Sequence, residues 1–178
     1  RRPADHLMSE RTESPQAAAS VRRVRISQGP EETAEWGRRL APLLQAGDVI
    51  ALRGELGAGK TTFVQGLARG LGITRPVTSP TFILINEYPS QPRLYHVDCY
   101  RIAEAVEAWA IGLDELINDD GVCVIEWAER VAPLLPSERL EVVLTWVGPQ
   151  TRRLEVMGYG TRLAALVRWM LKVDQRAG

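Results

Sequence analysis

The sequence predicts a three-layer α/β sandwich whose single sheet mixes parallel and antiparallel strands. Two observations lead to this fold class. Short apolar runs typical of buried strands alternate with stretches whose apolar residues recur at helical spacing. In addition, two pairs of strand-like runs are joined by short turns, which is typical of antiparallel neighbours. Strands with helices between them favour a sheet that is covered by helices on both faces.

The first elements are an extension, a strand and a helix. Residues 1–20 are polar and without periodicity, and we expect them to be disordered. Residues 21–26 alternate between apolar and polar and predict a strand. A helix is predicted to begin at Pro30, with acids in its first turn, and to continue to about Gln45.

Residues 54–62 read G-E-L-G-A-G-K-T-T and fit the phosphate-loop pattern G-x-x-x-x-G-K-[ST] at each fixed position. The run 48–53 before them is typical of a buried strand, and 63–71 after them have helical spacing up to Gly72. Glycines permit a tight turn, and backbone N–H groups at a helix start form a cradle for phosphate. The predicted nucleotide-binding loop consists of Gly54, Glu55, Leu56, Gly57, Ala58, Gly59, Lys60, Thr61 and Thr62.

Two side chains of this loop have expected roles. Lys60 would contact the β- and γ-phosphates, and the Thr61 hydroxyl would bind Mg²⁺. Among 22 Lys and Arg residues, only Lys60 and Lys172 are lysines. Lysine is a compact charge on a thin stem, whereas arginine is a planar fork, so this choice suits a narrow loop interior.

The second half of the chain alternates in the same way. Two strands, 81–88 and 93–98, are joined by a Pro-rich turn and predict an antiparallel pair. Residues 103–118 have a helical pattern interrupted at Gly112. The remaining predictions are a buried strand at 121–127, strands near 139–147 and 152–157, and a final amphipathic helix at 161–173.

Composition excludes several classes of function. The 178 residues carry a formal net charge of zero, so no overall field favours nucleic acid or a membrane surface. No apolar run approaches the roughly 20 residues that span a bilayer, and the N-terminus lacks a signal-like apolar core. Cys99 and Cys123 lie in apolar runs without metal-ligand spacing, and we expect buried free thiols in a reducing cytosol. His96 has no neighbouring His or Cys, so a zinc site is not expected.

Two acids could complete a nucleotide-hydrolysing site. Glu126 follows four apolar residues, and a parallel strand would deliver its carboxylate to the sheet edge where the phosphate loop opens. Asp98 ends a strand and could hold a metal-bound or attacking water, although an acid that caps the following turn has the same pattern. Hydroxyls of Thr78-Ser79-Pro80-Thr81 could contact a γ-phosphate. Trp127 could stack on a ligand, although a tryptophan after a strand is more often core.

Five motifs occur in order along the chain. They are G-E-L-G-A-G-K-T-T at 54–62, T-S-P-T at 78–81, Y-H-V-D-C-Y-R at 95–101, I-G-L-D-E-L at 111–116 and V-I-E-W at 124–127. This series, within about residues 21–157, resembles the bacterial TsaE family, whose members are needed to make threonylcarbamoyladenosine in tRNA. Many families share the phosphate loop, whereas the H-x-D-x-Y-R and I-E-W elements make the match specific.

The resemblance implies a P-loop NTPase-like fold and a weak, Mg²⁺-dependent ATPase in the cytoplasm. It implies action within a complex with TsaD and TsaB that installs threonylcarbamoyl on adenosine 37 of tRNA, ATP hydrolysis resetting the complex between turnovers. We expect tRNA to be met only through that complex, with no membrane involved. The implied division is an N-terminal extension (1–20), a P-loop ATPase domain (21–158) and a C-terminal helical extension (159–178).

The resemblance also implies residue roles. The implied catalytic residues are Lys60, Asp98 and Thr81. The implied Mg²⁺ ligands are Thr61 and Glu126. Trp127 would line the nucleotide site, and the helix start with Glu32 and Thr33 would lie near the adenine.

Two other functions remain open at this point. A small P-loop kinase of a metabolite or nucleotide would need an Arg-bearing lid. Arg130 and Arg139 flank a Pro-containing loop, but its apolar residues 131–136 make a poor lid. A nucleotide-gated binding module without turnover would be expected to lack both acids, yet Asp98 and Glu126 are present.

Overall fold

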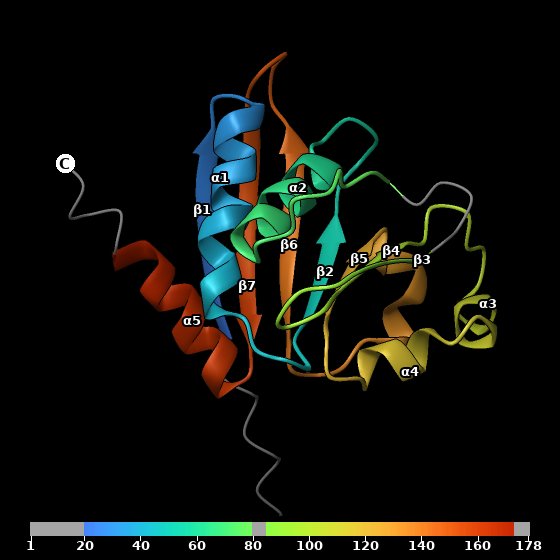
Figure 1. Cartoon of the computed structure of the whole chain (residues 1–178). Helices are drawn as coiled ribbons and strands as arrows, with labels where there is room; N and C mark the ends of the chain where they lie inside the picture. Colours follow the sequence, from blue (N-terminus) through green and yellow to red (C-terminus); the bar gives the residue numbers. More distant parts are fainter. Residues whose placement is uncertain (1–19, 80–84, 173–178) are drawn as a thin grey trace, which may run out of the picture.

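The computed structural model describes residues 20–79 and 85–172, and at its centre lies a seven-stranded sheet (Figure 1). The strands are β1 (Ser20–Ser27), β2 (Val49–Arg53), β3 (Ile85–Tyr88), β4 (Leu94–Asp98), β5 (Val122–Glu126), β6 (Arg139–Trp146) and β7 (Arg152–Tyr159). Their order across the sheet is β1-β7-β6-β2-β5-β4-β3. The pairs β2–β5, β2–β6 and β4–β5 are parallel, and the other neighbouring strands are antiparallel.

Helices cover both faces of the sheet. On one face α1 (Pro30–Leu40), α2 (Lys60–Gly70) and α5 (Thr161–Lys172) share a hydrophobic core with the strands. A second core lies on the opposite face, beneath α3 (Ala105–Ala110), α4 (Leu113–Ile117) and the 3₁₀ segment η2 (Ala128–Leu134). The predicted three-layer sandwich with a mixed sheet is therefore confirmed.

The helices α1 and α2 cross in close contact. A Cβ atom at Gly66 would lie 1.7 Å from the Ala34 carbonyl oxygen, and one at Gly37 would lie 2.2 Å from that of Phe63. Only glycine permits such an approach of two backbones. The crossing brings the first turn of α1 beside the start of α2, where the predicted phosphate loop ends.

Several element boundaries differ from expectation by a few residues. The helix expected to reach Gln45 ends at Leu40, and a 3₁₀ segment, η1 (Ala41–Leu43), follows. Pro42 explains this end, because its ring nitrogen has no hydrogen to donate to the preceding helical turn. Ser20, expected to be disordered, is the first residue of β1. Residues 1–19 and the expected strand start at 81–84 lie outside the described residues.

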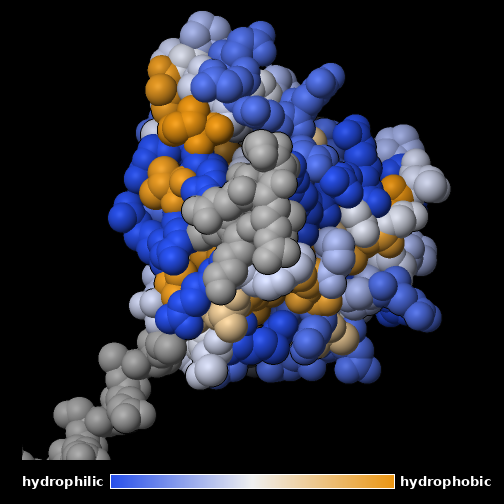
Figure 2. Space-filling view, turned by 90° about the vertical axis from the view of Figure 1, so that its left-hand side faces the viewer, coloured by the Kyte–Doolittle hydropathy of each residue, from blue (hydrophilic) through white to orange (hydrophobic). Residues whose placement is uncertain are grey.

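Other expectations hold. The helical stretch is divided near Gly112 into α3 and α4, as expected. The strands β3 and β4 form the expected antiparallel pair. Cys99 and Cys123 are free and buried, and burial raises the pKa of each thiol to about 12. None of the helices in the described ranges is long and apolar enough to cross a membrane. Figure 2, which faces the β1 edge, shows a largely hydrophilic surface with separate hydrophobic patches.

Candidate functional site

The loop at 54–59 joins the end of the buried strand β2 to the start of α2. Gly59, directly before the helix, has a φ of 103°, a left-handed conformation that favours glycine. The first N–H groups of a helix lack partners within the helix and carry partial positive charge. The start of α2 therefore offers a binding site for an anion at the end of β2.

Lys60 is the first residue of α2, and only 5% of it is exposed. Its ammonium group donates hydrogen bonds to the carbonyl oxygens of Gly54 at 2.5 Å and Glu55 at 2.9 Å. Burial lowers the pKa of Lys60, while the nearby charges of Glu126, Glu129 and Asp98 act in the opposite direction. The side chain is thus a partly desolvated cation held inside the loop.

The two predicted acids lie side by side. Register pairs Asp98 of β4 with Glu126 of β5, and both side chains are buried. The Thr61 hydroxyl lies 3.3 Å and 3.4 Å from the two Glu126 carboxylate oxygens. These atoms are hard oxygen donors, the kind that Mg²⁺ prefers. Among the residues that the structure describes, no cluster of three or more His, Cys, Asp or Glu side chains forms a metal cage.

Asp98 is held by two donors from different segments. The Ser79 hydroxyl donates to Oδ2 at 2.9 Å, and the Tyr100 backbone N–H donates to Oδ1 at 2.8 Å. The second bond is the turn-capping contact that a strand-end acid can make. Because the carboxylate also lines the pocket, capping the turn and facing a ligand are compatible roles.

Trp127 follows Glu126 in a strained conformation. Its φ of 57° is the one positive value found for a non-glycine residue in the described ranges. The Lys60 ammonium lies 4.5 Å from the centroid of a Trp127 ring, a cation–π distance. The rings of Trp127 and Tyr100 are 5.1 Å apart. The turn after β5 therefore aims an aromatic surface at the phosphate loop.

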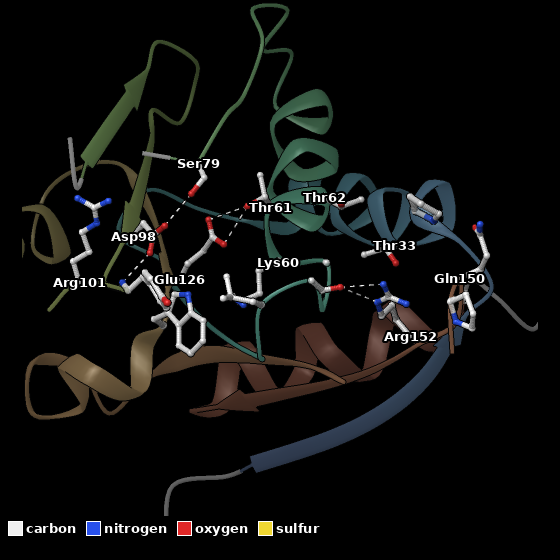
Figure 3. Close-up of a pocket in the computed structure, with 17 residues that line it drawn as sticks. Thr33, Lys60, Thr61, Thr62, Ser79, Asp98, Arg101, Glu126, Gln150 and Arg152 are labelled. Atoms are coloured by element: carbon white, nitrogen blue, oxygen red, sulfur yellow. Dashed lines mark hydrogen bonds between the residues drawn. The ribbon is translucent and has the colours of Figure 1, made fainter. Parts of the chain in front are cut away.

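These residues surround one pocket of about 530 Å³ (Figure 3). At one end lie Ser79, Asp98, Arg101 and Glu126. Trp127, the residue after Glu126, and Tyr100, whose ring contacts Trp127, also line the pocket. The loop and the start of α2 form the middle. At the other end, Thr33 of α1 lies with Gln150 and Arg152 of the β6–β7 hairpin. Pro30, in the first turn of α1, and Pro149, next to Gln150, also line the pocket. This volume is in the range of small-molecule sites.

The structure gathers most of the predicted site residues around this pocket, but not all. Those that line it are Thr33, Leu56, Gly57, Gly59, Lys60, Thr61, Thr62, Asp98, Glu126 and Trp127. Gly54, Glu55, Ala58 and Glu32 do not line it. The Glu32 carboxylate instead accepts a hydrogen bond from the Gln28 backbone N–H. Thr81 lies outside the described residues.

Two features of the site escaped the sequence analysis. Arg152 donates from Nε and Nη2 to the Gly57 carbonyl oxygen, at 3.3 Å and 3.0 Å, and so ties the hairpin to the loop. His96 is fully buried, and its Nε2 atom lies 2.5 Å from Oε2 of Glu126. Alternation along β4 puts His96 on the same face as Asp98, which was a usable signal. Nothing local in the sequence marked Arg152.

Comparisons with known proteins agree with the motif order. The family described as "Threonylcarbamoyl adenosine biosynthesis protein TsaE" matches residues 27–154. Two relatives carry the name "tRNA threonylcarbamoyladenosine biosynthesis protein TsaE". That of Bacillus subtilis (strain 168) is 43% identical over 146 residues, 82% of this chain and 91% of the relative. That of Treponema pallidum (strain Nichols) is 44% identical over 131 residues, 74% of this chain and 97% of the relative.

A solved structure shares the fold. The crystal structure of YdiB from Bacillus subtilis matches with a TM-score of 0.77 and 38% sequence identity. The match covers 88% of this chain and 98% of that one. The likeness identifies the fold as P-loop NTPase-like, as the resemblance to the TsaE family implied.

Proposed function

This chain belongs to the TsaE family, which takes part in tRNA threonylcarbamoyladenosine biosynthesis, and we propose that it is the Mg²⁺-dependent ATPase of that system. In this proposal the chain works in the complex with TsaD and TsaB that installs threonylcarbamoyl on adenosine 37 of tRNA. ATP hydrolysis resets the complex between turnovers. The complex works in the cytoplasm, and the chain meets tRNA only through it.

One observation carries the ATPase proposal: a buried cation, a hydroxyl and two carboxylates meet at one end of the phosphate loop. Lys60, Thr61, Asp98 and Glu126 come from three separate segments, yet all of them line the same pocket. A loop that only binds phosphate does not require the two acids. Phosphoryl transfer does require groups that hold a metal ion and orient the nucleophile.

In this proposal the loop and Lys60 bind the phosphates. The ammonium has three hydrogens to donate, and its present partners are two loop carbonyls. A phosphate in the loop would take over one or more of these bonds and meet the N–H groups at the start of α2. The partly dry surroundings of Lys60 strengthen its attraction to phosphate oxygens.

Thr61 and Glu126 have the chemistry to hold Mg²⁺. Mg²⁺ is usually bound by one or two carboxylates together with phosphate oxygens and waters, so a hydroxyl beside one carboxylate is sufficient. A Mg²⁺ ion held by Thr61 and Glu126 would help to neutralise negative charge on the phosphates of a bound nucleotide. The Thr61 contacts of 3.3 Å and 3.4 Å keep hydroxyl and carboxylate close enough to share one ion.

Asp98 has the geometry to orient the attacking water. Its carboxylate is fixed from both oxygens and lies one strand away from Glu126. Such a carboxylate can accept a hydrogen from water while keeping its position. The family resemblance implies that Thr81 and Trp127 also line the site. The stacking of Lys60 on Trp127 would then link the aromatic ring to phosphate contact.

The nucleotide base would lie at the opposite end. Pro30 and Thr33 on one side and Pro149 and Gln150 on the other bound this part of the pocket. The proline rings offer apolar surface, and the Gln150 amide offers both a donor and an acceptor for the edge of a base. Of the two residues expected near the adenine, Thr33 lines this part of the pocket and Glu32 does not. In this proposal Pro30 and Thr33 are therefore the α1 residues that contact the base.

The two arginines that a kinase lid would need make contacts within the fold instead. Arg130 lies against Tyr100 and Trp127 and donates to the Ile102 carbonyl oxygen at 3.2 Å. Arg139 is paired with Glu141 at 2.8 Å. Neither arginine lines the pocket, and both are engaged in contacts within the fold. The arrangement favours water over a bound metabolite as acceptor.

The deciding experiment measures ATP turnover as phosphate release by the purified chain, alone and with TsaB and TsaD. We expect slow release from the chain alone and a several-fold rise with both partners. The Asp98→Asn variant, assayed in the same mixtures, separates hydrolysis by this chain from any contaminating activity. Turnover that is absent in every mixture, or equal in wild type and variant, would overturn the proposal.

A further inference from the structure

His96 lies beneath the pocket, on β4, which runs between β5 and the edge strand β3. Alternation along this strand puts its side chain on the same face as Asp98, toward the core that contains α2. No part of His96 is exposed, and its Nε2 atom lies 2.5 Å from Oε2 of Glu126. The contact thus joins Glu126, which lines the pocket, to His96, which does not.

The other ring nitrogen decides which tautomer is present. Nδ1 of His96 is buried and has no hydrogen-bond partner among the residues that the structure describes. If Nδ1 carried a hydrogen, an N–H group would be buried unpaired, and a neutral ring would turn a lone pair toward the carboxylate. With a hydrogen on Nε2 the ring faces the carboxylate with a donor, so His96 donates to Glu126.

The two oxygens of Glu126 have different surroundings. Oε2 accepts from His96 at 2.5 Å, and the Thr61 hydroxyl lies 3.3 Å from Oε1 and 3.4 Å from Oε2. Since Glu126 is 3% exposed, water contributes little to holding its carboxylate. A short bond to Oε2 fixes the orientation of the carboxylate beside the Thr61 hydroxyl.

We propose that His96 is a positioning residue that orients Glu126 for Mg²⁺ binding. The inference rests on the proposed function, since it assigns Glu126 to the metal. Groups behind a metal ligand commonly fix its orientation, and their loss typically costs about 10- to 100-fold in metal affinity. His96 does this from beneath the sheet edge without lining the pocket.

The test compares His96→Leu with His96→Gln. Leucine has similar bulk and no donor, whereas the glutamine amide nitrogen reaches about as far as Nε2. The measurement is binding of a fluorescent ADP analogue across a Mg²⁺ titration and in EDTA. For His96→Leu we expect half-saturating Mg²⁺ to rise about 10- to 100-fold with binding in EDTA unchanged, and for His96→Gln a value near wild type.

Tyr95→Phe is the matched control. Tyr95 is the preceding residue on β4, faces the other core, and donates its hydroxyl hydrogen to Asp119. It should lose this bond without changing the Mg²⁺ response. If His96→Leu does not fold, His96→Asn replaces it, because its shorter amide cannot reach Glu126.

The outcomes separate this inference from the proposed function. A Mg²⁺ response that is the same in wild type and the donor-lacking variant overturns the role of His96 and leaves the ATPase proposal standing. Equal losses with Mg²⁺ and in EDTA, or no rescue by glutamine, point to a structural role and also overturn it. Wild-type chain that shows no Mg²⁺-dependent nucleotide binding overturns both.

Discussion

Lys60 combines burial, positive charge and proximity to three acids in one side chain. Its pKa is lowered by burial, and Glu126, Glu129 and Asp98 oppose that shift. A bound phosphate would add further negative charge beside the ammonium and stabilise its protonated form. The residue is therefore best suited to an anionic ligand rather than to a permanent internal ion pair.

Replacing Lys60 by alanine should weaken nucleotide binding and turnover together. Loss of hydrogen bonds from a charged donor costs about 2 kcal/mol, or roughly 30-fold in Kd. Arg69→Ala is the control, since Arg69 is an exposed cation in the last turn of the same helix. Calorimetric titration with ATP gives both affinities. Wild-type affinity in Lys60→Ala would refute the assignment of the phosphate loop.

The two acids should differ in what they lose. Glu126→Gln should raise the Mg²⁺ concentration needed for nucleotide binding, because a neutral amide is a poor ligand for a hard cation. Asp98→Asn should bind ATP nearly as well as wild type and hydrolyse it at least about 100-fold more slowly, the scale of lost general-base catalysis. Mg²⁺ titrations of binding, paired with single-turnover assays, measure both. Matching profiles for the two variants would rule out separate roles.

At the scale of elements, α5 is a packed part of the domain. Leu163 and Val167 are buried against β1 and β7, and Arg162 pairs with Asp48 at the start of β2. The stripe expected from helical spacing is therefore a packing face. Gly158 of β7 allows the approach, since a Cβ atom there would lie 2.2 Å from the Leu163 carbonyl oxygen.

The Leu163→Ala variant should destabilise the fold by about 2–5 kcal/mol, because it leaves a cavity under α5. Trp169, which is 53% exposed on the same helix, supplies the control. Its replacement by alanine should change stability by no more than about 0.5 kcal/mol. Urea unfolding followed by circular dichroism reports both. Equal effects at the two positions would mean that α5 does not pack in solution as described.

The stability that Glu155 contributes to the pairing of β1 with β7 should decrease at acid pH. Hydrogen bonds from Arg22 and then Arg153 lower the pKa of Glu155 from 4.5 to about 2. The folded chain thus keeps this carboxylate charged where the unfolded chain takes up a proton. Its contribution, about 1 kcal/mol or less because water screens the pair, is complete above pH 4.5 and disappears as the pH falls through about 2.

Thermal melts of wild type and Glu155→Gln between pH 7 and pH 2 test this. The difference in Tm between the two proteins should narrow as the pH falls below 4.5. A constant difference over the whole range would show that Glu155 stabilises the strand pair by packing and not by charge.

At the scale of the whole molecule, charge is balanced. The chain has 22 basic and 22 acidic residues, and the coloured part of the face in Figure 2 is mostly hydrophilic with separate hydrophobic patches. Affinity for nucleic acid depends chiefly on phosphate neutralisation by Lys and Arg. A chain with no net charge is therefore expected to bind tRNA weakly on its own.

Binding of the isolated chain to tRNA should be no tighter than about 1 μM at physiological salt, the strong end of non-specific binding. Filter binding with the chain alone, with TsaB and TsaD alone, and with all three separates the contributions. We expect tRNA to be retained on the filter in the mixtures that contain TsaB and TsaD, and not with the chain alone. A tight, salt-sensitive complex between the chain and tRNA alone would contradict this.

Local patterns in the sequence were sufficient for much of the fold. Apolar periodicity gave the strands and helices, because burial of one face imposes a period of two or of about 3.6. Where a local rule was overlooked, the prediction was wrong: Pro42 ends α1 at Leu40, five residues before the expected end. The glycine loop and the strand-end acids were visible because their chemistry is written in consecutive residues.

The sequence by itself thus determined the element types, the phosphate loop, the acids Asp98 and Glu126, and membership of the family. Only the tertiary structure decided that β4 lies beside β5 and β6 beside β2. Those neighbours bring His96 to Glu126 and Arg152 to Gly57. The physical reason is that a period along the chain reports which face of an element is buried, whereas contacts between distant residues depend on strand order and register, which no local period encodes.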